Sequence, residues 1–303
     1  MKNRLALAHP HLMALALAVG LLTQGAAPAQ EASKGPTGAA TPFKLGALEL
    51  VALRDTDFAL PNNGKTFGVD VGPAEVTKVL SSNGLPSDRI PVSVDALLVR
   101  TPGHVVVLDT GLGNPAASGL MLSLKLAGVT PDQVTDVLIT HTHGDHVGGL
   151  ATAAKTPAFP NARIRMSAKE WAYMQSQPAA KALAAAIAPQ VETFEPGQTV
   201  VPGVTAVAID GHTPGHVGYE IVSGRVHLLD IGDTAHSSVI SLAKPDWVMG
   251  FDSDPVVGKA SRRALLTRLA ATHELIFSPH FPYPGVGRIV TAGDGFAWRP
   301  ALE

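Results

Sequence analysis

The segment HTHGDH (residues 141–146) constrains this chain more than any other, because it places four metal-ligand side chains within six positions. It directly follows the apolar run at residues 137–140, which is typical of a buried β-strand. In an extended segment, residues two positions apart lie on the same side, so His141 and His143 can approach one point. In a helix the same two side chains would lie on different faces. The pattern therefore predicts a strand that ends in a ligand-bearing loop.

Histidine and aspartate ligands suit Zn²⁺, with Mn²⁺, Fe²⁺ and Co²⁺ as alternatives. Four donors so close together cannot all reach one ion at about 2 Å with good angles. We therefore expect two divalent ions per chain. The chain contains no cysteine, so it can form no disulfide and its metal sites must use histidine and carboxylate ligands.

Further ligand-type side chains stand downstream, in each case where an apolar strand is expected to end: Asp210, His212 and His216; Asp230 and Asp233; and His280. Rigid scaffolds commonly display functional residues on loops in this way. The expected strands and helices mix without a strict alternation. This order predicts an α/β fold with two mixed sheets and helices packed outside them.

The N-terminal residues have the three parts of a secretory signal peptide: the cations Lys2 and Arg4, an apolar run at 12–22 and a small-x-small site at 27–29. We predict cleavage before Gln30 and a periplasmic or secreted protein. Residues 30–44 are expected to form a flexible lead-in, and residues 45–303 one catalytic domain. The apolar run is short for a bilayer and no later segment qualifies, so we expect no membrane anchor.

The formal net charge of −2 argues against nucleic acid or anionic lipid as a partner, because such proteins carry a basic surface. Apolar residues make up 46% of the chain and charged residues 16%, which is ordinary for a globular protein. The expected partner is therefore a small molecule.

Together, H-x-H-x-D-H at 141–146, G-H-T-x-G-H at 211–216, G-D at 232–233 and a late histidine resemble the ligand series of the metallo-β-lactamase superfamily. The resemblance covers nearly the whole chain from about residue 45 and implies an αββα sandwich. It also implies one ion held by His141, His143 and His212, a second held by Asp145, His146 and His280, and Asp233 as the bridge. By the same resemblance, His216 and Asp109 support the ligands.

Within the superfamily, residues 208–216, 251–254 and 280–287 are similar to the exported methyl parathion hydrolases and to related lactonases and arylesterases. Two features depart from the phosphotriesterases: residues 112–115 lack a pocket aromatic, and His236 stands where those enzymes carry an aliphatic residue. Many lactonases have a hydrogen-bonding residue there. The resemblance therefore favours lactones or aryl esters as substrates, with phosphotriester hydrolysis as a side activity, and suggests a homodimer.

The chemistry implied by this resemblance is attack by a hydroxide that bridges two cations, with Asp145, Asp233 and His236 as catalytic residues. His236 would hydrogen-bond the substrate carbonyl or protonate the leaving alkoxide. The expected pocket aromatics are Trp171, Phe251 and Phe281, whereas Phe58 and Phe194 are expected in the core.

Three alternative functions remain open at this point. The chain could be a dedicated phosphotriesterase like the methyl parathion hydrolases. It could be a mononuclear iron oxygenase that acts on sulfur substrates, as some members of the superfamily are. It could also bind metal without catalysis, although the complete ligand series favours an enzyme.

Overall fold

The computed structural model describes residues 37–302, which form two seven-stranded β-sheets. Sheet 1 follows the order of the chain, with an antiparallel half up to β4 and a parallel half from β4 to β7. Its strands are β1 (Ala39–Leu45), β2 (Leu48–Pro61), β3 (Arg89–Thr101), β4 (His104–Leu108), β5 (Asp136–Leu138), β6 (Arg163–Ser167) and β7 (Val191–Phe194).

Sheet 2 has the order β14-β13-β12-β11-β10-β9-β8. Its neighbouring strands are antiparallel, except for the parallel pair β11 and β12. The strands are β8 (Thr199–Val201), β9 (Val204–Ala208), β10 (Val217–Ser223), β11 (Val226–Asp230), β12 (Leu275–Phe277), β13 (Val286–Ala292) and β14 (Gly295–Pro300).

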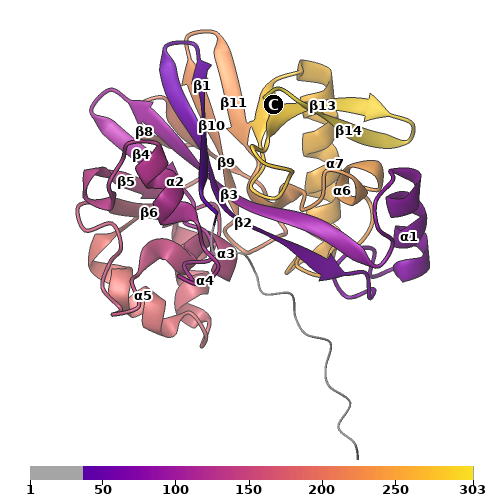
Figure 1. Ribbon diagram of the computed structural model, residues 1–303, viewed down its shortest axis with the longest axis horizontal. Helices are drawn as coiled ribbons and strands as arrows, with labels where there is room; N and C mark the ends of the chain where they lie inside the picture. The colour runs from indigo at the N-terminus through magenta and orange to yellow at the C-terminus, as the bar shows by residue number, and fades with distance from the viewer. Residues whose placement is uncertain (1–36, 303) are drawn as a thin grey trace, which may run out of the picture. The chain divides into compact units, whose positions relative to one another are not determined.

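The helices pack on the outer faces of the two sheets (Figure 1). Sheet 1 is covered by α2, α4 and α5, whose residues Leu124, Met174 and Ile187 pack against its strands. Sheet 2 is covered by the long helix α7, through Leu266 and Leu269. The helices are α1 (Pro73–Ser82), α2 (Leu120–Leu126), α3 (Gly144–Val147), α4 (Ala168–Ser176), α5 (Lys181–Ile187), α6 (Ile240–Ala243) and α7 (Pro255–Thr272).

A central apolar layer joins the inner faces of the sheets, where Leu97 and Leu138 meet Ala206, Tyr219 and Leu228. This arrangement confirms the predicted αββα sandwich. It also explains the apolar run at residues 96–99 in β3, because both faces of this strand are buried and neither face needs polar side chains.

The β2–β3 hairpin extends beyond the rest of sheet 1 and carries α1 at its far end (Figure 1). Asn62 Nδ2 lies within hydrogen-bond distance of Pro73 O, Thr77 Oγ1 and Ser87 O, and so holds the two ends of this insertion together. Phe67 packs with Ile240 and Met249 in a small separate core. The extended part of the β2–β3 hairpin, here called the β2–β3 arm, therefore contacts α6, which lies on the side of sheet 2.

The expected flexible lead-in is wrong for residues 39–44, which belong to β1. This strand pairs with β2 from Ala39 to Leu45, and the backbone N–H of Ala39 donates to Ser123 Oγ at 3.0 Å. Residues 43–45 (FKL) alternate in burial, as expected of a strand. The small residues that precede them made this alternation hard to recognise in the sequence. The predicted signal peptide lies outside the described residues. Within residues 37–302, no helix has the length and apolar character needed to cross a bilayer.

Candidate metal centre

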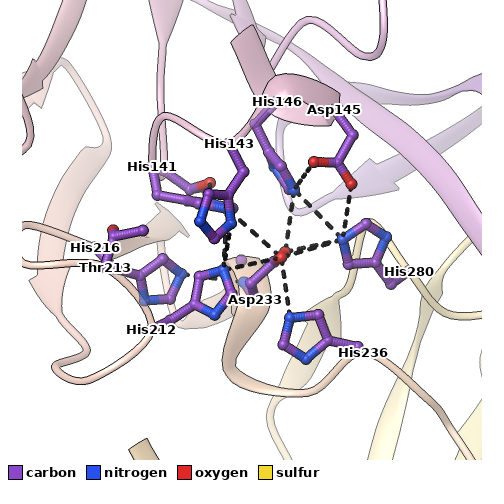
Figure 2. A network of polar contacts seen from close by, with 12 residues as sticks. His141, His143, Asp145, His146, His212, Thr213, His216, Asp233, His236 and His280 are labelled. Atoms are coloured by element: carbon purple, nitrogen blue, oxygen red, sulfur yellow. Dashed lines mark hydrogen bonds and ion pairs between the residues drawn. The ribbon is translucent and has the colours of Figure 1, made fainter. Parts of the chain in front are cut away.

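The ligand-type side chains come from four loops, each at the carboxyl end of a strand (Figure 2). The loop after β5 supplies His141 and His143 and then turns into α3, which carries Asp145 and His146. The loops after β9, β11 and β12 supply His212, Asp233 and His280. Both sheets thus deliver ligands to one point.

These side chains form two groups, in each of which the ligand atoms lie within 4.8 Å of one another. The first ligand group is His141, His143, His212 and Asp233, and the second ligand group is Asp145, His146 and His280. In the first, His212 Nε2 lies 3.1 Å from His141 Nε2 and 3.0 Å from His143 Nδ1. In the second, His146 Nε2 lies 3.3 Å from His280 Nε2.

Asp233 lies between the two groups (Figure 2). Its Oδ2 is 3.2 Å from His212 Nε2, and its Oδ1 is 3.2 Å from His146 Nε2 and 3.1 Å from His280 Nε2. Asp145 is more distant, at 3.8 Å from His146 Nε2 and 3.7 Å from His280 Nε2. Asp233 Oδ2 also lies 3.2 Å from His280 Nε2, so the carboxylate is in reach of both groups, as a bridge would be.

The spacing of these atoms fits metal ions. Bonds of 2.0–2.1 Å in a tetrahedron place neighbouring ligand nitrogens about 3.3 Å apart, close to the separations found here. Imidazole lone pairs that face one another at this distance repel unless a cation or a proton lies between them. In addition, Asp233 Oδ1 is buried and accepts no hydrogen bond from the described residues. Both groups can therefore hold a divalent ion.

Two imidazoles of the first ligand group, His141 and His143, are held in the neutral form that binds metal. Burial lowers the pKa of His141 well below its usual value, and burial together with the neighbouring His212 lowers the pKa of His143 to about 4. Burial works to lower the pKa of the third, His212, but its hydrogen bonds to Asp233 and Asp252 raise it. Burial opposes ionisation of Asp233, but the surrounding histidines, His146 first, outweigh it and hold the pKa of this carboxyl well below its usual range. The bridge position is therefore ionised.

The pKa of His146 is shifted in the opposite direction from those of His141 and His143. Burial works to lower its pKa, but the carboxylates of Asp233, Asp145 and Asp109 hold the pKa well above the usual value. Its Nδ1 lies 2.8 Å from Asp109 Oδ2, and the same carboxylate accepts from the backbone N–H and the hydroxyl of Thr140. Asp109 therefore connects Thr140, which directly precedes the ligand loop, to His146 of the second ligand group. This is the kind of supporting contact that the resemblance implied for Asp109.

His216 holds the backbone of the bridging aspartate. Its Nδ1–H donates to Ile209 O at 2.9 Å, which leaves Nε2 to accept from the Asp233 N–H at 3.0 Å. Gly232 has φ +46° there, and a Cβ at this position would stand 2.5 Å from His216 Nε2. Only glycine fits the position, which explains the Gly-Asp pair.

Glu170 is a residue of the site that the sequence did not reveal. It is fully buried in α4 and accepts four hydrogen bonds: from the N–H and hydroxyl of Thr142, the hydroxyl of Thr213 and the N–H of Gly215. One carboxylate thus joins the loop of His141 and His143 to the loop of His212. The only signal in the sequence was an acid on the buried side of a short helix.

His236 lies beside the bridge, with Nε2 3.2 Å from Asp233 Oδ2. Its ring stacks on that of His280 and packs against Phe251 and the edge of Phe67. Burial lowers the pKa of His236, so the ring is neutral at physiological pH. Its Nδ1 has no hydrogen-bond partner among the described residues.

A cavity of about 470 Å³ opens over the two ligand groups. Its polar floor includes His143, Asp145, Asp233, His236 and His280, and its walls include Phe58, Leu60, Val92 and Phe251. Three of these wall residues belong to the β2–β3 arm. The cavity therefore pairs a polar floor with an apolar wall.

Among the aromatics expected in the pocket, Phe251 lies on the wall, but the expectation was wrong for Trp171 and Phe281. Trp171 packs against the outer core of sheet 1 and does not line the cavity. Phe281 is fully buried behind sheet 2, against Trp298. Phe58 was expected in the core; it lines the cavity with 37% of its surface exposed.

Comparison with known proteins agrees with this geometry. The structure resembles that of AidC, described as a dizinc quorum-quenching lactonase, with a TM-score of 0.83 and 29% identity over 88% of this chain and 98% of that one. An N-acyl homoserine lactonase of Bacillus cereus is 25% identical over 60% of this chain and 80% of its own length.

A ribonuclease Z of Methanothermobacter thermautotrophicus is 32% identical over 28% of this chain, but the match spans only 25% of that enzyme. The family model of the metallo-beta-lactamase superfamily matches residues 89–280, from β3 to the last ligand histidine. On this match, the chain belongs to the metallo-β-lactamase superfamily.

Proposed function

We propose that this protein is a dinuclear metal-dependent hydrolase that opens lactones, with Zn²⁺ as its metal. The observation that carries the proposal is the position of Asp233 between two histidine groups on the floor of a half-apolar cavity. The likeness to AidC and to the Bacillus cereus lactonase supports the substrate class. A mononuclear iron site is disfavoured, because the second ligand group also converges, with its ligand atoms within 4.8 Å of one another.

His141, His143 and His212 would hold one ion, Asp145, His146 and His280 the other, and Asp233 both. When bound, such a pair of ions supplies Lewis-acid activation of water and of the substrate oxygen. The protein fixes the ligand atoms in advance: Asp109, His216 and Glu170 orient them through buried hydrogen bonds.

His236 would act on the substrate itself. It is a neutral imidazole at the cavity floor, so its N–H can donate a hydrogen bond to a carbonyl oxygen or to the alkoxide as it departs. A lactone depends on such a donor, because the conjugate acid of its alkoxide has a high pKa. A nitrophenolate leaves as a stable anion and does not.

The apolar wall indicates which lactones fit. Phe58, Leu60, Val92 and Phe251 face a floor of polar and charged groups. An N-acyl lactone has the matching form, with a polar ring at one end and an apolar chain at the other. Aromatic wall residues also suit an aryl group, so the proposal includes aryl esters as substrates and phosphotriesters as side substrates. In the alternative hypothesis, the protein is a dedicated phosphotriesterase.

Export to the periplasm or the medium and assembly as a homodimer complete the proposal. The three-part N-terminal pattern supports export. The absence of cysteine suits an oxidising compartment.

The proposal is tested with the zinc-loaded protein on an N-acyl homoserine lactone, a phenyl ester, a nitrophenyl phosphotriester and a β-lactam. We expect the lactone to have the highest kcat/KM. His236→Leu should lower kcat/KM for the lactone by about tenfold to a hundredfold, the scale of a positioned proton donor, and leave the phosphotriester equal or improved.

His227→Leu is the control, since that histidine lies on the exposed part of β11 and contacts Glu220. Equal losses on both substrates in His236→Leu would mean a structural role for the ring. Turnover of the phosphotriester alone would replace the lactonase assignment with the phosphotriesterase one.

A further inference from the structure

Arg262 is a buried cation in α7, with only 1% of its surface exposed. Burying a guanidinium costs free energy unless hydrogen bonds and an opposite charge compensate it. Its Nε donates to Pro245 O at 2.9 Å and its Nη2 to Trp247 O at 3.2 Å. Its Nη1 and Nη2 both lie 3.4 Å from Asp252 Oδ2. The charge of Arg262 is thus directed at one carboxylate.

Asp252 connects this cation to a ligand of the first group. Its side chain is 2% exposed, and its Oδ1 lies 3.1 Å from His212 Nδ1. An ionised carboxylate can only accept, so His212 carries its proton on Nδ1. The other nitrogen, Nε2, points to His141, His143 and Asp233, so it is the atom of His212 that faces an ion in the first ligand group.

The loop that carries Asp252 runs beside the His212 loop. The backbone N–H of Ser253 donates to His212 O, and that of Asp254 donates to Gly211 O, both at 2.9 Å. These bonds set the distance between the loops, but they leave the Asp252 side chain free to rotate. The two Nη atoms of the Arg262 guanidinium hold Oδ2 of Asp252, the oxygen that does not contact His212.

The second ligand group is oriented differently. His280 Nδ1–H donates to the backbone carbonyl of Ser93 at 2.7 Å, and His146 faces Asp109, whose further partners are the neutral groups of Thr140. Neither arrangement includes a buried cation. The dependence on an arginine is therefore specific to His212.

We propose that Arg262 is a positioning residue: it fixes Asp252, which holds the Nδ1 side of His212, so that the ring presents its Nε2 to an ion in the first ligand group. The proposal rests on the proposed function, since it assumes that this group binds metal. Partners of ligand histidines commonly change metal affinity by 10- to 100-fold when they are removed.

The test begins with zinc titration of the metal-free protein against a competing chelator. Arg262→Met should weaken one of the two binding events by about 10- to 100-fold and leave the other within about threefold. Arg263→Met is the matched control: it is the next residue, it also pairs with an aspartate, Asp246, but it is exposed. It should leave both affinities unchanged.

A second readout separates positioning from general loosening. With ¹⁵N-labelled histidine, the zinc-loaded wild-type protein should show the Nδ1–H of His212 protected from exchange with water by its hydrogen bond to Asp252, and Arg262→Met should speed the exchange of that proton. His212→Gln assigns the resonance. An unchanged exchange rate, equal weakening of both ions, or the same loss in Arg263→Met would each overturn the proposal.

Two further outcomes are distinct. If the wild-type protein binds no divalent ion, the proposed function fails; if it binds two and Arg262→Met binds both as tightly, only the positioning role fails. If Arg262→Met does not fold, Arg262→Met combined with Asp252→Leu removes both buried charges, an exchange that proteins often tolerate. This double variant should show the same selective loss, and wild-type affinity in it would refute the proposal.

Discussion

Asp95, in β3, is a buried carboxyl whose two oxygens accept no hydrogen bond from the described residues. Only its backbone is held, by the N–H donated to Pro279 O at 3.0 Å. Burial raises the pKa of Asp95 well above its usual value, although Arg54 works in the opposite direction. The folded protein therefore keeps this side chain protonated over a pH range in which the unfolded chain has already released the proton.

This difference makes stability depend on pH with a definite sign. Above the unfolded pKa, near 4, and up to the raised folded pKa, the folded state binds the extra proton, so stability falls as pH rises. Asp95→Asn cannot ionise. Its advantage over the wild type should be small near pH 4 and grow steadily as the pH rises to 8. Urea unfolding of both proteins at pH 5 and pH 8 measures it, with the exposed Asp88→Asn as control. An advantage independent of pH would contradict this account.

At this scale, the sequence predicted which ligand-type side chains would converge and named two of their supports, Asp109 and His216, but it missed three others. Residues 141–146 stand out because their ligands are contiguous, and the ligand at 212 and the acid at 233 stand in short motifs with glycine. Glu170, Asp252 and Arg262 are single charged residues on helices or loops, where the same residue types normally face solvent. Only tertiary contacts distinguish them. The same limit explains Trp171 and Phe58, since an aromatic residue fits a core and a cavity wall equally well.

Among the elements, those with a strong apolar period were predicted within a few residues. The apolar run at 104–108 predicts a strand and forms β4, and the amphipathic pattern at 257–272 predicts a helix and forms α7, which begins two residues earlier with Pro255 after the capping Asp254. The strand β6 (RIRMS) was missed because two arginines hide its alternation. The hairpin of β13 and β14 and the helix α1 were also missed, since their segments are short, rich in small residues, or interrupted by glycine.

The helix α4 belongs to the site as much as to the outer layer, because Glu170 ties two ligand loops together. Glu170→Gln replaces one acceptor oxygen with an NH₂ group that faces donors, so at least one buried N–H or hydroxyl loses its partner. We expect a loss of about 2 kcal/mol in stability. For a domain of this size that corresponds to several degrees in Tm, measurable by circular dichroism.

The matched control for this prediction is Glu192→Gln in β7, a half-exposed residue that pairs with Arg163 and Arg165. Exposed ion pairs of this kind contribute little, so its Tm should stay within about a degree or two of the wild type. Similar Tm values for the two variants would show that the four hydrogen bonds of Glu170 do not restrain the loops.

Across the whole molecule, each ligand group draws on both sheets. The first takes His141 and His143 from sheet 1 and His212 from sheet 2; the second takes His146 from sheet 1 and His280 from sheet 2. The order of the elements predicted two mixed sheets with helices outside. It did not predict that each ligand group would combine residues of both sheets, because that depends on which edges of the sheets face each other. An ion in either group would fasten one sheet to the other.

Metal removal should therefore destabilise the entire fold and not only the loops. A ligand present at a thousand times its Kd adds about 4 kcal/mol, so two ions together should raise Tm by more than about 10 °C relative to the chelated protein. Elemental analysis should give about two divalent ions per chain, and zinc added back should restore Tm in two steps. His280→Ala, which lacks a ligand of the second group alone, should retain one ion and show one step. A wild-type stoichiometry of one, or a Tm that chelation does not change, would mean that the sheets are held by their apolar layers without the contribution of a dinuclear centre.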